Sequence, residues 1–68
     1  MTYETAKEIV AGGLAFFDPT NAIFRSINQI EDEDERSELM VDVEMITKHS
    51  TALIFKAIKK YPDLNPFK

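Results

Sequence analysis

The stretch that decides the fold of this chain is residues 39–58, LMVDVEMITKHSTALIFKAI. Its apolar residues recur at steps of three, four and seven, which is the spacing of one face of an α-helix. One row follows the a/d pattern of a coiled coil, with Ser50 in its gap: Leu39, Val43, Ile46, Leu53 and Ala57. The pattern predicts a long helix over about residues 34–60, ended by Pro62, which disfavours helical angles at Tyr61.

The same stretch holds more apolar residues than a helix needs when it packs on one side only. The surplus lies outside the a/d row: Met40, Val41, Met45, Ala52, Ile54, Phe55 and Ile58. One face of the helix can pack on the rest of the chain, and the surplus face then predicts a second partner, either a copy of this chain or a target protein. The residues expected to make partner or dimer contacts are Leu39, Met40, Val43, Met45, Ile46, Leu53 and Phe55.

Two shorter helices are predicted upstream, over residues 3–17 and 19–30. Thr2 is a suitable N-cap for the first helix, and Asp18 followed by Pro19 is typical of an N-cap and a first helical residue. The three helices together predict an all-α fold, a three-helix bundle in which the long C-terminal helix also serves for dimerisation.

The pair Gly12–Gly13 falls inside the first predicted helix and allows two interpretations. Glycine costs about 1 kcal/mol relative to alanine inside a helix, so the helix could bend or fray there. Alternatively, the bare backbone lets another helix approach closely. We favour the first interpretation, because helix propensity alone explains a break.

Length and composition limit the possibilities further. Residues 1–68 are expected to form a single small domain, which buries only about 60% of the surface of its unfolded chain. The chain has no cysteine and one histidine, so neither a disulfide nor a zinc site of the usual kind can stabilise it. Self-association is the remaining common means of stabilisation, and we expect a cytoplasmic homodimer without a cofactor or a membrane span.

Charge is distributed unevenly along the long helix. Residues 31–44 carry eight acids and one arginine, a net charge of −7, whereas residues 45–68 carry five lysines and one aspartate, a net charge of +4. Acids near a helix N-terminus and lysines near its C-terminus are stabilised by the helix dipole, which is sufficient to explain the layout. Antiparallel pairing of two copies of this helix would use the same layout. The expected electrostatic contacts are Glu35, Glu38, Asp42, Lys56, Lys59 and Lys60.

The charged residues are also compatible with three other functions: metal binding, mimicry of nucleic acid and association with DNA. Glu35, Glu38 and Asp42 share a helical face and could hold a magnesium ion, which would suit an enzyme with a carboxylate–metal site. The acidic run could also mimic nucleic acid. The lysines at the basic end could serve a DNA-associated regulator, although the net charge of −4 argues against binding to phosphate backbone.

No motif in the sequence predicts catalysis. Phosphate-binding loops, dinucleotide fingerprints, nucleophile elbows and zincin helices are all missing. His49 has no acid placed to orient it, so we interpret it as a polar helix residue or as a pH-dependent contact in a dimer. The tail at 61–68 carries Tyr61, Leu64 and Phe67, which could either pack back on the domain or dock elsewhere. The sequence therefore favours a non-enzymatic, protein-binding regulator or inhibitor, of a size that would suit a phage or bacterial accessory factor.

Overall fold

The computed structural model of the chain describes residues 1–67 and consists of helices and turns within that range. The helices are α1 (Tyr3–Ala15), α2 (Phe17–Ile27) and α3 (Glu33–Lys60), followed by a single 3-10 turn, η1 (Pro62–Leu64). Lys68, the last residue of the predicted tail, lies outside the described residues. The all-α prediction is confirmed.

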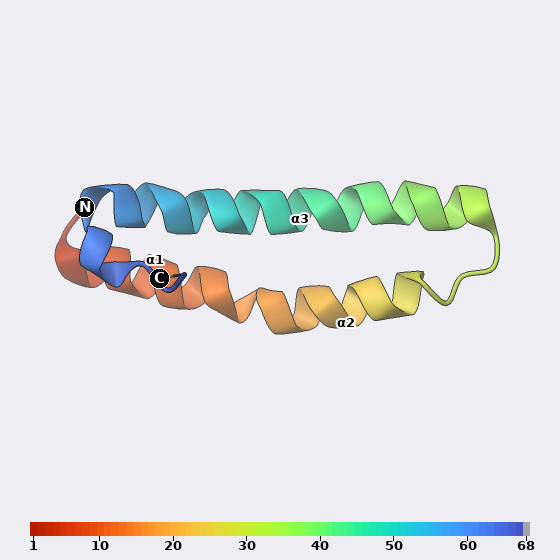
Figure 1. Cartoon of the computed structure of the whole chain (residues 1–68), viewed down its shortest axis with the longest axis horizontal. Helices are drawn as coiled ribbons and strands as arrows, with labels where there is room; N and C mark the ends of the chain where they lie inside the picture. The colour runs from red at the N-terminus through yellow and green to blue at the C-terminus, as the bar shows by residue number, and fades with distance from the viewer. Residues whose placement is uncertain (68) are drawn as a thin grey trace.

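The arrangement of the helices differs from the predicted three-helix bundle. Figure 1 shows α1 and α2 following one another along one line, with α3 running back beside both. The chain is thus a two-armed hairpin 46 Å long, 19 Å wide and 15 Å thick, and the bent first arm is formed by α1 and α2 together. Because the two shorter helices are end to end, they do not make two separate layers against α3.

The bend in the first arm falls at Phe16, and Pro19 explains its position. Proline lacks the amide N–H that would donate to the carbonyl of Ala15, four residues earlier, and its ring crowds that carbonyl. At the bend the Phe16 amide donates to the carbonyl of Gly13, three residues earlier, at 3.3 Å, as in a 3-10 turn. The Thr20 hydroxyl also donates to the Phe16 carbonyl, a contact that bends helices. Asp18 lies inside the first turn of α2, so the prediction that it caps a helix starting at Pro19 is wrong.

The other helix ends follow ordinary capping rules. Thr2 accepts a hydrogen bond from the Thr5 amide at 3.2 Å, and Asp32 accepts one from the Glu35 amide at 3.0 Å. The loop before α3 is closed by the Arg36 guanidinium, which donates to the Ile30 carbonyl at 2.9 Å. The predicted second helix continued to residue 30, but α2 ends at Ile27, since the following residues turn toward this contact.

The main core lies where α1 packs on the second half of α3. Its fully or nearly fully buried members are Ala6, Val10, Ile54, Ala57 and Ile58. Gly13 is buried beside it, and a Cβ atom added there would stand 2.5 Å from Ile54 Cγ1 and 2.9 Å from Ile54 Cδ1. Helix α1 continues through both glycines, so the favoured interpretation of a break at Gly12–Gly13 is wrong. Gly13 instead lets the two arms approach closely.

The segment after α3 packs back on the hairpin. The Tyr61 hydroxyl donates to the Met1 carbonyl at 3.1 Å, and the Tyr3 hydroxyl donates to Asp63 Oδ2 at 2.9 Å. The Tyr3 and Tyr61 rings meet edge to face with centroids 5.4 Å apart. The hydrogen bond to the Asp63 carboxylate raises the pKa of Tyr3, because the bond holds the phenol proton in place. The tail therefore joins the two ends of the chain.

Candidate protein-binding face

The contact between the two arms is made by residues spaced seven apart. The inner row of the first arm consists of Ala6, Gly13, Thr20 and Ile27, all of them buried. The inner row of α3 consists of Val43, Ser50 and Ala57, also buried. A seven-residue period keeps one stripe of each helix on its partner along a long contact, as in coiled coils. The row in the first arm continues across the bend at Phe16.

Beside each inner row runs an outer row, three residues further along the chain. In the first arm it contains Ile9, Phe16 and Ile23, with Ile30 in the loop after α2, and in α3 it contains Leu39, Ile46 and Leu53, with Lys60 at the next seven-residue step. Five of these large side chains, Phe16, Ile23, Leu39, Ile46 and Leu53, are between 40% and 50% exposed, and the two isoleucines at the ends are half-buried. We call the surface formed by the two outer rows the open face.

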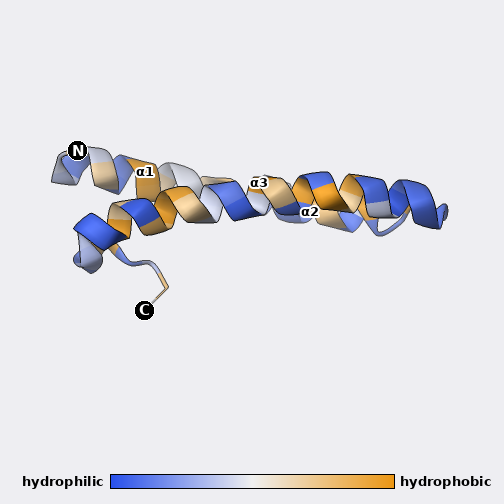
Figure 2. Ribbon diagram, turned by 90° about the horizontal axis from the view of Figure 1, so that it is seen from above, coloured by the Kyte–Doolittle hydropathy of each residue, from blue (hydrophilic) through white to orange (hydrophobic). Residues whose placement is uncertain are grey.

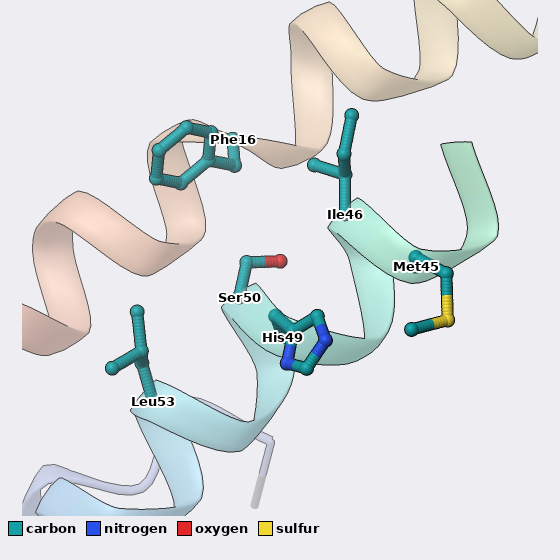
Figure 3. Close-up of a pocket in the computed structure, with 6 residues that line it drawn as sticks. All are labelled: Phe16, Met45, Ile46, His49, Ser50 and Leu53. Atoms are coloured by element: carbon teal, nitrogen blue, oxygen red, sulfur yellow. The ribbon is translucent and has the colours of Figure 1, made fainter. Parts of the chain in front are cut away.

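A shallow groove of about 350 Å³ shows that the two outer rows lie on the same side of the hairpin. Phe16 from the first arm and Ile46 and Leu53 from α3 line it together, and Ser50 forms its floor. Figure 3 shows Phe16 on the first arm, with the Ile46 and Leu53 side chains pointing from α3 toward that arm, while His49 and Met45 stand on the α3 side of the groove. Since Ile23 and Leu39 are each seven residues from a lining residue, they extend the same surface.

The opposite side of the hairpin is partly covered. Phe67 in the tail lies 6.4 Å from the Phe17 ring and 5.8 Å from the Phe55 ring, measured between centroids. Phe17 points about 100° away from Phe16 because they are neighbours on a helical path. Figure 2 shows the segment after α3 lying to one side of the hairpin. The tail therefore shields apolar side chains on one side, and the open face lies on the other.

The structure divides the predicted contact residues into three groups. Leu39, Ile46 and Leu53 lie on the open face, with Met45 at its groove. Phe55 is half-exposed beside the tail. Met40 is half-buried, and Val43 is 2% exposed within the contact between the arms, so both belong mainly to the hairpin itself.

Sequence reasoning missed two central residues of the open face, Phe16 and Ile23. Their spacing of seven was the available signal. It was obscured because the predicted helices ended at residue 17 and restarted at residue 19, which divides the row between two separate elements. The row becomes visible only when the first arm is treated as one bent helix.

The charged residues form a third row on α3, next to the outer row. We call it the rim: Glu35, Asp42, His49 and Lys56, again seven apart and all exposed. The other expected electrostatic contacts, Glu38, Lys59 and Lys60, are exposed as well. The rim therefore changes from acidic to basic along the length of α3.

The polar groups at the groove are few. Of its six lining residues, His49 is the titratable one, and the Ser50 hydroxyl donates to the Thr47 carbonyl at 3.1 Å. Among residues 1–67, no cluster of three or more histidine, cysteine or acidic side chains is arranged to hold a metal ion. In the same range, no helix is both long enough and apolar enough to cross a membrane.

Comparison with known protein families, with curated proteins and with solved structures gives no match for this chain. The interpretation of the open face therefore depends on its geometry and chemistry alone.

Proposed function

We propose that this protein is a small, non-enzymatic, cytoplasmic regulator or inhibitor that acts by contact with protein, through the open face. The observation that carries the proposal is the set of five large apolar side chains held 40–50% exposed in two parallel rows. Soluble proteins of this size seldom expose a contiguous apolar surface unless it serves as an interface.

The energetics support binding. Complete burial of a large aliphatic or aromatic side chain contributes about 1.5–3 kcal/mol, so covering the exposed half of each would contribute about 1 kcal/mol. Five such residues supply enough apolar contact for the centre of an interface, where large apolar and aromatic side chains carry most of the binding energy. The exposed charges of the rim are suited to the polar edge that surrounds such a centre.

The chemistry of the groove also favours contact over catalysis. A hydrolytic or transfer site would need a nucleophile or base oriented by a third group. At the groove the serine hydroxyl is occupied by a main-chain carbonyl, and the other side chains apart from His49 are apolar.

Site-specific photo-crosslinking in the native cell tests the proposal. A photoreactive residue replaces Leu53 on the open face in one variant and Val41, which is 59% exposed and lies outside both outer rows, in the control. We expect covalent adducts to protein, either a second copy or another polypeptide, from position 53 and few or none from position 41. Equal labelling at the two positions, or no adduct at position 53, would contradict the proposed function.

A further inference from the structure

Building on the proposed function, we infer that the open face is covered by a second copy of this chain. The two hairpins stack face to face with their loops at opposite ends, and Ile46 lies on the two-fold axis. The product is a four-helix bundle in which α3 packs antiparallel on the second α3, and each first arm packs on the other first arm. The two chains therefore have a defined relative direction and register.

The outer row of α3 is the first argument, because it is self-complementary in one antiparallel register. When Ile46 faces Ile46 of the second copy, the seven-residue spacing places Leu39 opposite the second copy's Leu53. An interface with two-fold symmetry needs this property, since a contact of residue i with residue j of the second copy is always repeated as a contact of j with i. Every large side chain of the row then meets another large apolar side chain.

The rim supports the same register, because each of its acidic residues then lies opposite a basic residue of the second copy. Glu35 comes opposite the second copy's Lys56, and Asp42 comes opposite its His49. Each of these pairs occurs twice in the dimer. The rim changes from acidic to basic residues at its midpoint, between Asp42 and His49, which is the arrangement that an antiparallel pair centred near Ile46 requires. Complementary charges at the edge of an interface also select the orientation of the partners.

The first arm is the second argument, and it is independent of α3. Its two most exposed outer-row residues, Phe16 and Ile23, pair with each other across the interface when the axis lies midway between them. Gly13 packs against Ile54 and the Ser50 carbonyl. Counting along the antiparallel arms from these two contacts, the midpoint between Phe16 and Ile23 stands opposite residues 43–48 of α3, a range centred near Ile46. Both arms therefore place the two-fold axis at the same level of the hairpin.

The alternative face-to-face dimer, with both loops at one end, gives fewer charged residues a partner of opposite charge. It would place the two segments of net charge −7 at the same end of the dimer, where like charges repel. It would also set the rim of α3 against the corresponding row of the first arm. That row consists of uncharged residues that offer no partners to the rim: Thr5, Gly12, Pro19 and Ser26.

The available area suits a stable dimer. One broad side of the hairpin, 46 Å by 19 Å, projects roughly 870 Å², close to the about 800 Å² that each partner contributes to a standard interface. The seven residues of the outer rows run along most of this length. Two hairpins packed in this way would enclose the five large side chains that the open face of each leaves exposed.

Sedimentation equilibrium over a dilution series tests the association. We expect a mass of twice 7.8 kDa at high concentration, with a dissociation constant that rises with salt because the rim pairs are screened. Ile46→Glu would place two carboxylates together at the axis and should weaken the dimer at least about a hundredfold. Val41→Glu, at a residue outside the outer rows and the rim, should leave the constant unchanged. Helical circular dichroism of Ile46→Glu checks that the monomer still folds.

A charge-reversal cycle tests the register. Glu35→Lys alone or Lys56→Glu alone should each weaken the dimer about tenfold, since each variant sets like charges opposite one another at two places. The double variant should restore the dimer to within about threefold of the natural chain. In the dimer with both loops at one end the two residues are far apart, and the effects of the two changes would simply add.

The orientation is measured directly with a spin label on a single cysteine, which is possible because the chain has none of its own. Labels at Glu31, in the loop, should lie apart by about the 46 Å length of the hairpin, whereas labels at the same end would be separated by little more than its 15–19 Å cross-section. A monomer at all concentrations, additive charge reversals or a short label distance would each overturn the inference. If the chain is monomeric but Leu53 still crosslinks to another polypeptide, the proposed function survives and the self-pairing does not.

Discussion

Replacing Gly13 by alanine tests the close approach of the two arms, which is the least expected feature of the hairpin. Two effects act in opposite directions. Alanine in place of glycine stabilises a helix by about 0.8–1.0 kcal/mol. The added methyl group would stand 2.5 Å from Ile54 Cγ1, well inside van der Waals contact, so either the side chain or the helix has to move.

The neighbourhood of Ile54 determines the size of the penalty. Its side chain is fully buried and packs in the cluster with Ala6, Val10 and Ala57, and a change of rotamer in such a close-packed core displaces its neighbours. The Ser50 carbonyl, 3.4 Å from the added methyl group, limits movement in the other direction. Overpacking of this kind costs about 1–3 kcal/mol. The net effect of Gly13→Ala is then a loss of up to about 2 kcal/mol, despite the better helix propensity.

Gly12→Ala is the matched control, because a methyl group at Gly12 meets nothing within 4 Å. It should stabilise the chain by about 0.4–1 kcal/mol. Urea unfolding of both variants at one protein concentration measures the difference between them, which we expect to be about 1–3 kcal/mol, or roughly 1 M in the midpoint. If Gly13→Ala proves as stable as Gly12→Ala, the arms do not approach closely at this point, and the packing described for the core is incorrect.

Two further predictions concern the ends of the hairpin. Asp32→Ala removes the N-cap of α3 and should lower the free energy of unfolding by about 1 kcal/mol, whereas Asp32→Asn should retain most of it, as urea unfolding will show. The Tyr3 phenol donates to Asp63 and its pKa is raised, so this contact is present below pH 10 and is lost as the pH rises through the raised pKa. In a Tyr61→Phe background, where one tyrosine remains, Asp63→Ala should return the Tyr3 pKa toward 10.0; an unchanged absorbance titration of tyrosinate would contradict the hydrogen bond.

The long helix was predictable because strong local signals mark both of its ends. The predicted range of about 34–60 differs from α3 (Glu33–Lys60) by one residue. Asp32 provides a cap before the first apolar residue, and Pro62 stops the helix at the other end. The apolar period between them is long enough that no competing structure fits it.

The first arm was predicted less well because the same local signal fits two structures. A proline after a capping residue marks a new helix in one case and a bend within a continuing helix in the other. The choice depends on whether residues on both sides of the bend can pack on one partner. Here Gly13 and Thr20 both lie against α3, and that is a contact between distant parts of the chain. Local spacing holds no information on it.

The glycine pair shows the same limitation. Helix propensity assigns equal costs to Gly12 and Gly13, yet one is exposed with open space around it and the other is pressed against Ile54. The difference arises from which face of α1 meets α3. A seven-residue count from Ala6 to Gly13 and Thr20 distinguishes the two glycines, but only after the partner helix is known to be antiparallel and adjacent.

The distribution of side-chain size between the rows is what connects the fold to its proposed function. A hairpin that had to be stable by itself would place its largest apolar residues between the arms. In this chain the inner rows are mostly small, with alanine, glycine, threonine and serine at Ala6, Gly13, Thr20, Ser50 and Ala57. Ile54 and Ile58 are buried between the arms, but five other large side chains stand in the outer rows, at Phe16, Ile23, Leu39, Ile46 and Leu53. Small inner residues draw the arms together and bring the outer rows of both arms onto one surface, so the hairpin exposes the apolar volume that a second layer of helices would need.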